Sequence, residues 1–298
     1  MRKTKRFTPT VIARFLREGR GNGTHEDYIP WHRVSRGDPS SRGRSHLLLW
    51  RSRLRELLSD GELGAQLFAT MLPDLDDSLE QFLLSIEDSA HPIAAYGENC
   101  GSAVFPGTER LASELGIRHP RVTGNGSSAK WRATTDLLLV FKQAGLPRSM
   151  LAVAFKPIDW GGKARERELL RLEREYWVRR QVPWLLVTPT LYDQRTVLTL
   201  RRVSCWGLAE DVAAADVALA AQIAEAQVSS SLTQVLHQIA ERVGTLEVAQ
   251  RALWRSVWSG RLRVDLRMGW RPHAPLRHIS LKAFTALNPI ASRRTAWI

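Results

Sequence analysis

Cysteine is scarce in this sequence of 298 residues, which contains only Cys100 and Cys205. Two thiols exclude a disulfide framework of the kind that stabilises small secreted domains. They are also too few for a cysteine-rich zinc site. We therefore expect the protein to work in a reducing compartment, the bacterial cytoplasm.

Long apolar runs are missing as well. The sequence has no stretch of about 18 consecutive apolar residues, so no membrane-spanning helix is predicted. Residues 1–6 are basic, but no apolar segment follows them, and a signal peptide would need one. We expect a protein without a membrane partner.

The overall composition is that of a folded protein. Hydrophobic residues make up 44% of the chain and charged residues 24%, which excludes a wholly disordered chain. At roughly 100–200 residues per domain, the length predicts two domains. We place them at residues 1–189 and 190–298.

Positive charge is abundant and unevenly distributed. Lys and Arg number 43 against 30 Asp and Glu, for a net charge of +13. Residues 1–56 hold a net +9, residues 57–229 a net −4, and residues 230–298 a net +8. Arginine suits phosphate oxygens and base edges, so the two cationic ends predict nucleic-acid or partner contacts. A solvated basic surface is the alternative. The candidate contact residues are Arg42, Arg44, Arg251, Arg255, Arg261 and Arg263.

The first domain is predicted to be α/β with a mixed sheet. Apolar runs over residues 79–86, 136–141, 150–155 and 182–188 indicate strands. Apolar residues have helical spacing over residues 51–72 and 163–181, and Ser59 or Asp60 could cap a helix that starts near Gly61.

The second domain is predicted to be mainly helical. Residues 209–228, 232–242 and 245–258 have helical patterns. Residues 260–266 alternate with period two and therefore predict a strand. Two helices followed by a basic strand are typical of a winged helix.

The hairpin between residues 136 and 156 carries the most informative polar residues. Asp136 opens an apolar strand, and Lys156 closes the next strand before Pro157. A turn centred near Leu146 would make Asp136 and Lys156 cross-strand neighbours. A carboxylate and an ammonium group at the end of a buried sheet form either a structural ion pair or part of a site.

Two further acids could join this pair. Glu62 begins an otherwise apolar helical segment, where a carboxylate commonly does no more than interact with the helix dipole. Glu173 lies within a charged helical run that is most simply a solvated, ion-paired face. Together, Glu62, Asp136 and Lys156 have the chemistry of a metal-dependent nuclease, because carboxylates bind Mg²⁺ and a lysine stabilises developing negative charge. The histidines lack metal-ligand spacing and are assigned no site.

The first 190 residues resemble the TnsA family of endonuclease subunits from Tn-seven-type transposons. The matching segments lie at residues 17–21, 27–31, 39–46, 58–63, 80–82, 117–120, 135–136, 156–157, 172–177 and 183–184. The resemblance implies a restriction-endonuclease-like fold followed by a winged-helix-like domain. It places Glu62, Asp136 and Lys156 at catalytic positions and Glu173 at an auxiliary acid. Ala154 stands where the family usually has Gln.

The resemblance also implies a cofactor, partners and a reaction. Two Mg²⁺ ions are implied, with Mn²⁺ able to substitute and with Glu62 and Asp136 as metal ligands. The implied partners are transposon-end DNA, a TnsB-type DDE transposase and a TnsC-type AAA+ ATPase regulator. The implied reaction is hydrolysis of the non-transferred 5′ strands during cut-and-paste transposition. A stand-alone restriction or repair nuclease and a non-catalytic DNA-binding adaptor are the alternatives.

Overall fold

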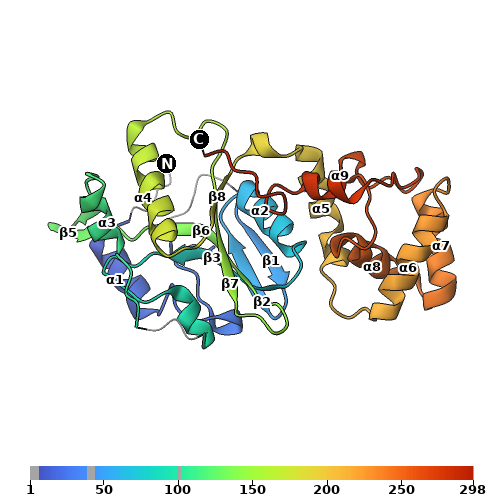
Figure 1. Ribbon diagram of the computed structural model, residues 1–298, viewed down its shortest axis with the longest axis horizontal. Coiled ribbons are helices and arrows are strands. Elements are labelled where there is room, and N and C mark those ends of the chain that lie inside the picture. Colours follow the sequence, from blue (N-terminus) through green and yellow to red (C-terminus); the bar gives the residue numbers. More distant parts are fainter. Residues whose placement is uncertain (1–6, 39–43, 99–101, 298) are drawn as a thin grey trace. The chain divides into compact units, whose positions relative to one another are not determined.

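The computed structural model describes residues 7–38, 44–98 and 102–297, which form two compact units (Figure 1). The first unit contains the described residues up to Leu63, then Asp74–Val187 and Trp297. The second contains Gly64–Pro73 and Thr188–Ala296. The first unit is mixed α/β and the second is helical, so the predicted fold class is confirmed.

A four-stranded sheet forms the centre of the first unit. Its order is β3-β6-β7-β8, with antiparallel pairing from β3 to β7 and parallel pairing between β7 and β8. The strands are β3 (Leu75–Leu83), β6 (Thr134–Phe141), β7 (Ser149–Phe155) and β8 (Trp184–Val187). The middle of β6 is fully buried, as an apolar strand covered on both faces should be.

Helix α4 (Ala164–Arg179) connects β7 to β8 and lies alongside the sheet (Figure 1). A crossover helix of this kind is what joins two parallel neighbours. Trp177 is fully buried, and its ring centroid lies 5.6 Å from that of Phe82 in β3. The indole Nε1 of Trp177 donates to Thr135 Oγ1 of β6 at 2.7 Å, which fixes the helix against the middle of the sheet.

The helix expected to start near Gly61 is confirmed, but residues 53–57 form a strand, which corrects the helical spacing predicted from residue 51 onward. A hairpin of β1 (His46–Trp50) and β2 (Arg53–Leu57) comes first, and α2 (Asp60–Thr70) follows. The side chains of Arg53 and Glu80 are buried together, with both guanidinium NH groups 2.7 Å from the carboxylate. This long-range ion pair favours a strand where the local leucine spacing also suits a helix.

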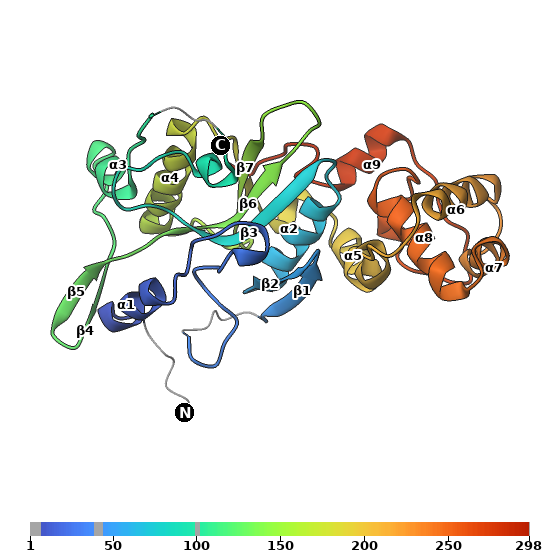
Figure 2. The ribbon, with the colours of Figure 1, turned by 90° about the horizontal axis from the view of Figure 1, so that it is seen from below.

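The amino-terminal segment packs against a second hairpin. Helix α1 (Pro9–Arg17) buries Phe15 against Trp31, with ring centroids 5.3 Å apart. The hairpin of β4 (Arg121–Gly124) and β5 (Ser127–Lys130) extends beside α1 (Figure 2). Short helices occur at α3 (Thr108–Glu114), η1 (His25–Asp27) and η2 (Pro92–Tyr96).

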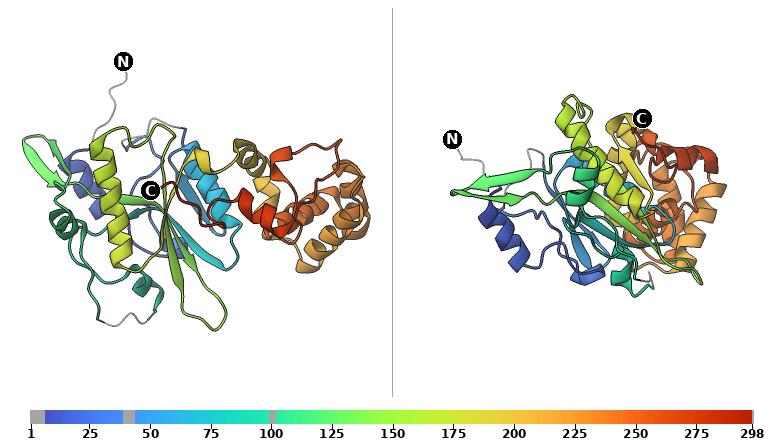
Figure 3. Two further views of the ribbon diagram at one scale, coloured as in Figure 1. Left: turned by 45° about the horizontal axis from the view of Figure 1, so that its top comes forward. Right: turned by 60° about the vertical axis from the view of Figure 1, so that its left-hand side comes forward.

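Helix α8 (Leu246–Trp258) is the centre of the second unit and packs against three other helices (Figure 3). These helices are α5 (Gln194–Gly207), α6 (Ala214–Ala226) and α7 (Leu232–Val243). The unit also contains η3 (Pro189–Leu191), η4 (Leu266–Met268) and α9 (Leu281–Leu287). The later part of α2 belongs here, since Trp258 donates to Thr70 Oγ1 at 3.0 Å.

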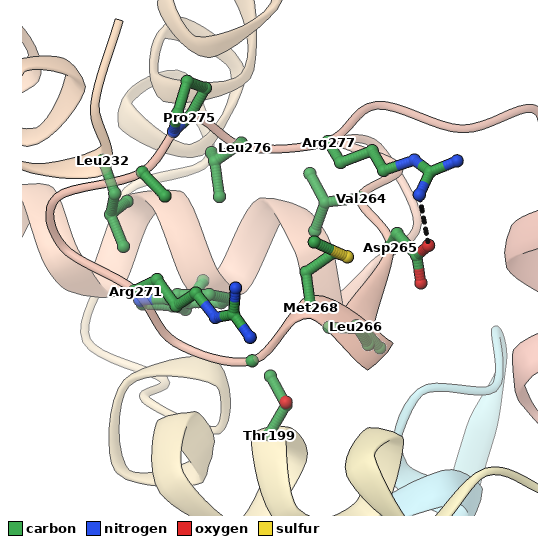
Figure 4. Close-up of a pocket in the computed structure, with 13 residues that line it drawn as sticks. Thr199, Leu232, Val264, Asp265, Leu266, Met268, Arg271, Pro275, Leu276 and Arg277 are labelled. Atoms are coloured by element: carbon green, nitrogen blue, oxygen red, sulfur yellow. Dashed lines mark ion pairs between the residues drawn. The ribbon is translucent and has the colours of Figure 1, made fainter.

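The predicted strand over residues 260–266 is wrong. Gly260 adopts a φ of +72° just after α8, and the segment then makes an isolated β-bridge between Val264 and His278. Asp265 caps the 3-10 turn that follows, which ends the extended backbone. The same segment lines a cavity of about 50 Å³, and two neighbouring lining residues, Arg277 and Asp265, form an ion pair at 4.0 Å (Figure 4).

Within the described part of the chain, no helix has both the length and the apolar character needed to cross a bilayer.

Candidate active site

Glu62 is held at the start of α2 by a helix cap. Ser59 Oγ accepts a hydrogen bond from the Glu62 backbone N–H at 3.1 Å. In return, the Glu62 carboxylate accepts from the Leu58 backbone N–H at 2.9 Å and from Ser59 Oγ at 3.3 Å. This reciprocal pattern resembles a capping box and orients a side chain that is only 8% exposed.

Burial raises the pKa of Glu62 to about 7, and the negative charge of Asp136 adds to the rise. Hydrogen bonds from Leu58 and Gln81 act in the opposite direction. Glu62 and Asp136 therefore lie close enough to interact electrostatically, although 74 positions separate them in the sequence.

Asp136 and Lys156 meet at one end of β6 and β7. Lys156 Nζ donates to Asp136 Oδ2 at 3.0 Å, and the Phe155 backbone N–H donates to the same oxygen at 2.7 Å. Burial acts to lower the pKa of Lys156, but the carboxylates of Asp136 and Glu173 outweigh it and raise that pKa. Lys156 is therefore an ammonium ion at neutral pH.

The predicted register of this hairpin is wrong by two positions. Leu137 pairs with Val153 and Phe141 with Ser149, so the turn is centred at Gly145 rather than Leu146. Asp136 and Lys156 are consequently diagonal rather than directly opposed. They still meet because side chains alternate with period two, and a two-residue offset leaves both on the same face.

Glu173 belongs to α4, is 6% exposed and interacts electrostatically with Lys156. Its Oε1 accepts from Thr135 Oγ1 at 2.9 Å and from Trp184 Nε1 at 3.3 Å. Burial raises the pKa of Glu173 to about 7; the charge of Lys156 opposes this rise and that of Asp136 adds to it. The solvated-face interpretation of this acid is therefore wrong.

Sequence analysis missed two neighbours of this cluster. Gln81 of β3 donates to Glu62 Oε2 at 3.1 Å. Burial lowers the pKa of His32 to about 4, while the charge of Asp136 acts to raise it. The His32 ring stacks on Trp131 with centroids 6.0 Å apart. Gln81 lies in the family-like segment 80–82, but no local pattern gives it a role and none marks His32, because both reach the site through long-range packing.

The cluster can be tested for its fit to a hard divalent cation. Within the described residues, no three His, Cys, Asp or Glu side chains lie close enough to hold a metal ion by themselves. Glu62 and Asp136 supply two carboxylates whose negative charges oppose one another. Mg²⁺ commonly uses one or two carboxylates and completes its shell with water and substrate phosphates, so this donor set fits it.

The candidate arginine at the amino-terminal end has an acidic partner. Arg44 is exposed and pairs with Asp60 at 2.9 Å, at the beginning of α2. Arg42 lies outside the described residues.

The carboxy-terminal candidates fall into two groups. Arg251 pairs with Glu247 at 2.6 Å, and Arg255 donates to the Gly207 carbonyl at 3.4 Å, so both serve the helical packing of their own unit. Arg261 and Arg263 are exposed just after α8. DNA or partner contact by these residues stays a prediction.

Comparison with known proteins adds a similarity in sequence to this geometry. No protein family model matches the sequence. The transposition protein TnsA of transposon Tn7 from Escherichia coli is 33% identical over 184 residues, which cover 61% of this chain. Those residues span 58% of TnsA, so less than two thirds of that relative's length is matched. The similarity supports a relationship between this chain and TnsA-like proteins over the matched stretch.

Proposed function

We propose that this protein is a transposition endonuclease that hydrolyses the non-transferred 5′ strands at transposon ends. The observation that carries the proposal is the meeting of Asp136 and Lys156 at 3.0 Å, with Glu62 in electrostatic contact. The similarity to a Tn7 transposition protein supports the same reaction class. A purely structural ion pair would not need the second acid beside it, since like charges disfavour each other.

We propose Mg²⁺ as the cofactor, with Mn²⁺ able to replace it and two ions at the working site. Glu62 and Asp136 would hold the metal. When bound, Mg²⁺ polarises the phosphodiester and lowers the pKa of an attacking water.

Lys156 is suited to act on the scissile phosphate. Two of its three N–H donors are used by Asp136 Oδ2 and the Phe155 carbonyl, each at 3.0 Å. Its remaining donor can reach a phosphate oxygen, where the ammonium charge stabilises negative charge that develops during cleavage. Glu173, held by Thr135 and Trp184, keeps Lys156 protonated from the buried side.

The proposed partners follow from the similarity to TnsA. They are transposon-end DNA, a TnsB-type DDE transposase that cuts the other strand, and a TnsC-type AAA+ ATPase regulator. The assembled complex would act on the bacterial nucleoid. A partner that locates the ends removes the need for base-specific contacts from this chain.

Reconstitution on end-labelled transposon DNA tests the proposal. The chain, the transposase and the ATPase would be combined with Mg²⁺, and 5′-strand cleavage would be measured. Asp136→Asn is expected to reduce cleavage more than about 100-fold, because losing even an outer-shell partner of a metal costs 10–100-fold. Asp74→Asn, the same change at an exposed residue, is the matched control and should cleave normally.

Each alternative predicts a different result. Cleavage by the purified chain without partners would identify a stand-alone nuclease. DNA binding without cleavage under any condition, or full cleavage by Asp136→Asn, would overturn the proposal in favour of an adaptor or another site.

A further inference from the structure

Gln81 occupies an unusual position in β3. It is 3% exposed, and its φ of +50° lies in the left-handed region that favours glycine. Strain of this kind persists only when the surroundings enforce it, and it clusters at functional sites. Glycine would adopt this backbone without strain, so the side chain of Gln81 is retained at an energetic cost.

The side-chain amide of Gln81 links two elements of the candidate site. Its Nε2 donates to Glu62 Oε2 at 3.1 Å, and its Oε1 accepts from Thr134 Oγ1 at 3.2 Å. An ionised carboxylate can only accept hydrogen bonds, so the amide nitrogen faces Glu62 when that group is ionised. The Thr134 hydroxyl is the donor that satisfies the opposite end.

The position of Gln81 in the sheet brings this link beside Asp136. Glu80 pairs with Leu137 and Phe82 pairs with Thr135, so Gln81 lies across from Asp136 in the register. The other donors to the Glu62 carboxylate, Leu58 and Ser59, come from the start of its own helix. The bond from Gln81 instead ties Glu62 to the sheet that carries Asp136.

We propose that Gln81 is a positioning residue that holds the Glu62 carboxylate at the distance from Asp136 that cation binding requires. This proposal rests on the proposed function for its catalytic meaning. The geometric part of the proposal, that Gln81 holds Glu62 in place, does not depend on the proposed function.

Two substitutions separate positioning from a general structural role. Gln81→Gly removes the amide and also relieves the backbone strain, which offsets part of the cost of the two lost hydrogen bonds. Gln81→Glu keeps the shape but replaces the donor by an acceptor, which should push the Glu62 carboxylate away. Gln143→Glu, the same isosteric change at an exposed turn residue, is the matched control.

Three measurements on the full-length chain test the proposal. Crystal structures of the variants would report the position of the Glu62 carboxylate. Calorimetric titration with Mn²⁺ would report cation affinity, and the reconstituted complex would report cleavage. We expect Glu62 to move in both variants and Mn²⁺ affinity to fall roughly 10–100-fold, with cleavage falling in parallel. The Gln143→Glu control should match the wild type.

The outcomes distinguish the two proposals. An unmoved Glu62 carboxylate in both variants, or unchanged Mn²⁺ affinity in a wild type that binds the ion, would overturn the role of Gln81. A displaced Glu62 in variants of a wild type that neither binds Mn²⁺ nor cleaves would support the positioning and overturn the proposed function. Lower thermal stability with unchanged cation affinity would identify Gln81 as a purely structural residue.

Discussion

Replacing Glu173 with Gln should stabilise the cation-free protein at high pH and have little effect at low pH. In the folded protein the pKa of Glu173 is raised to about 7 by burial, compared with its ordinary value of 4.5. Between these two values the folded state holds a proton that the unfolded state has released. The free energy of unfolding of the wild type therefore decreases as pH rises through this window.

The magnitude follows from the width of the window. A span of about 2.5 pH units at about 1.36 kcal/mol per unit gives a loss of about 3 kcal/mol at pH 8. The amide introduced by Glu173→Gln would keep an oxygen that can accept from Thr135 and Trp184, and it has no charge to bury. As pH rises from 4.5 to 8, the free energy of unfolding of the variant should therefore increase by about 3 kcal/mol relative to that of the wild type. This corresponds to roughly 6–10 °C in apparent Tm.

Thermal unfolding of both proteins in a chelating buffer, from pH 4.5 to pH 8.5, measures this difference. Glu168→Gln is the matched control, because Glu168 is an exposed residue of the same helix whose loss should change stability little at any pH. A wild-type-to-variant difference that stays constant with pH, or that favours the wild type at pH 8, would refute the reasoning.

Other substitutions test the packing around the site and in the helical unit. Burial lowers the pKa of His32 from 6.5 to about 4, so the free energy of unfolding of the wild type should fall as pH decreases through this range. The His32→Phe variant has no imidazole to protonate and should avoid about 3 kcal/mol of that loss. Denaturant unfolding at pH 7 and pH 4.5 measures the difference. A Cβ at Gly61 would lie 1.8 Å from Phe155 Cε1, so Gly61→Ala should lower stability by about 1–3 kcal/mol and reduce cleavage, because it displaces the neighbours of both Glu62 and Lys156. A Cβ at Gly207 would lie 2.2 Å from Trp258 Cε3, so Gly207→Ala should destabilise the helical unit by a similar amount in calorimetry; unchanged unfolding would contradict this packing.

The local sequence pattern was enough to predict secondary structure where burial and periodicity agree. The apolar runs of β6 and β7 predicted two adjacent buried strands, and helical spacing predicted α4, α7 and α8. Local pattern failed at residues 53–57, where the leucine spacing suits a helix but a strand forms. There the buried pair of Arg53 with Glu80, 27 positions away, accompanies a strand instead. It also failed at residues 260–266, where alternation occurs without a partner strand to form a ladder.

The candidate site shows the same division. Asp136 and Lys156 could be placed together from the sequence, because a hairpin is local and an error of two in its register preserves the face. Glu62 was grouped with them by its chemistry and by resemblance to a family, because no local pattern places it beside the hairpin. Nothing in the local sequence distinguished Glu173 from its exposed neighbours on α4.

The sequence by itself determined the uneven charge, the buried hairpin and the residues whose chemistry suits phosphodiester hydrolysis. Only the tertiary structure decided that Glu62 lies near Asp136, that Glu173 is buried behind Lys156, and that Gln81 connects Glu62 to the sheet. The physical reason is range. Strand and helix periodicities act over a few residues, whereas these contacts form when residues 17 to 74 positions apart pack into one core.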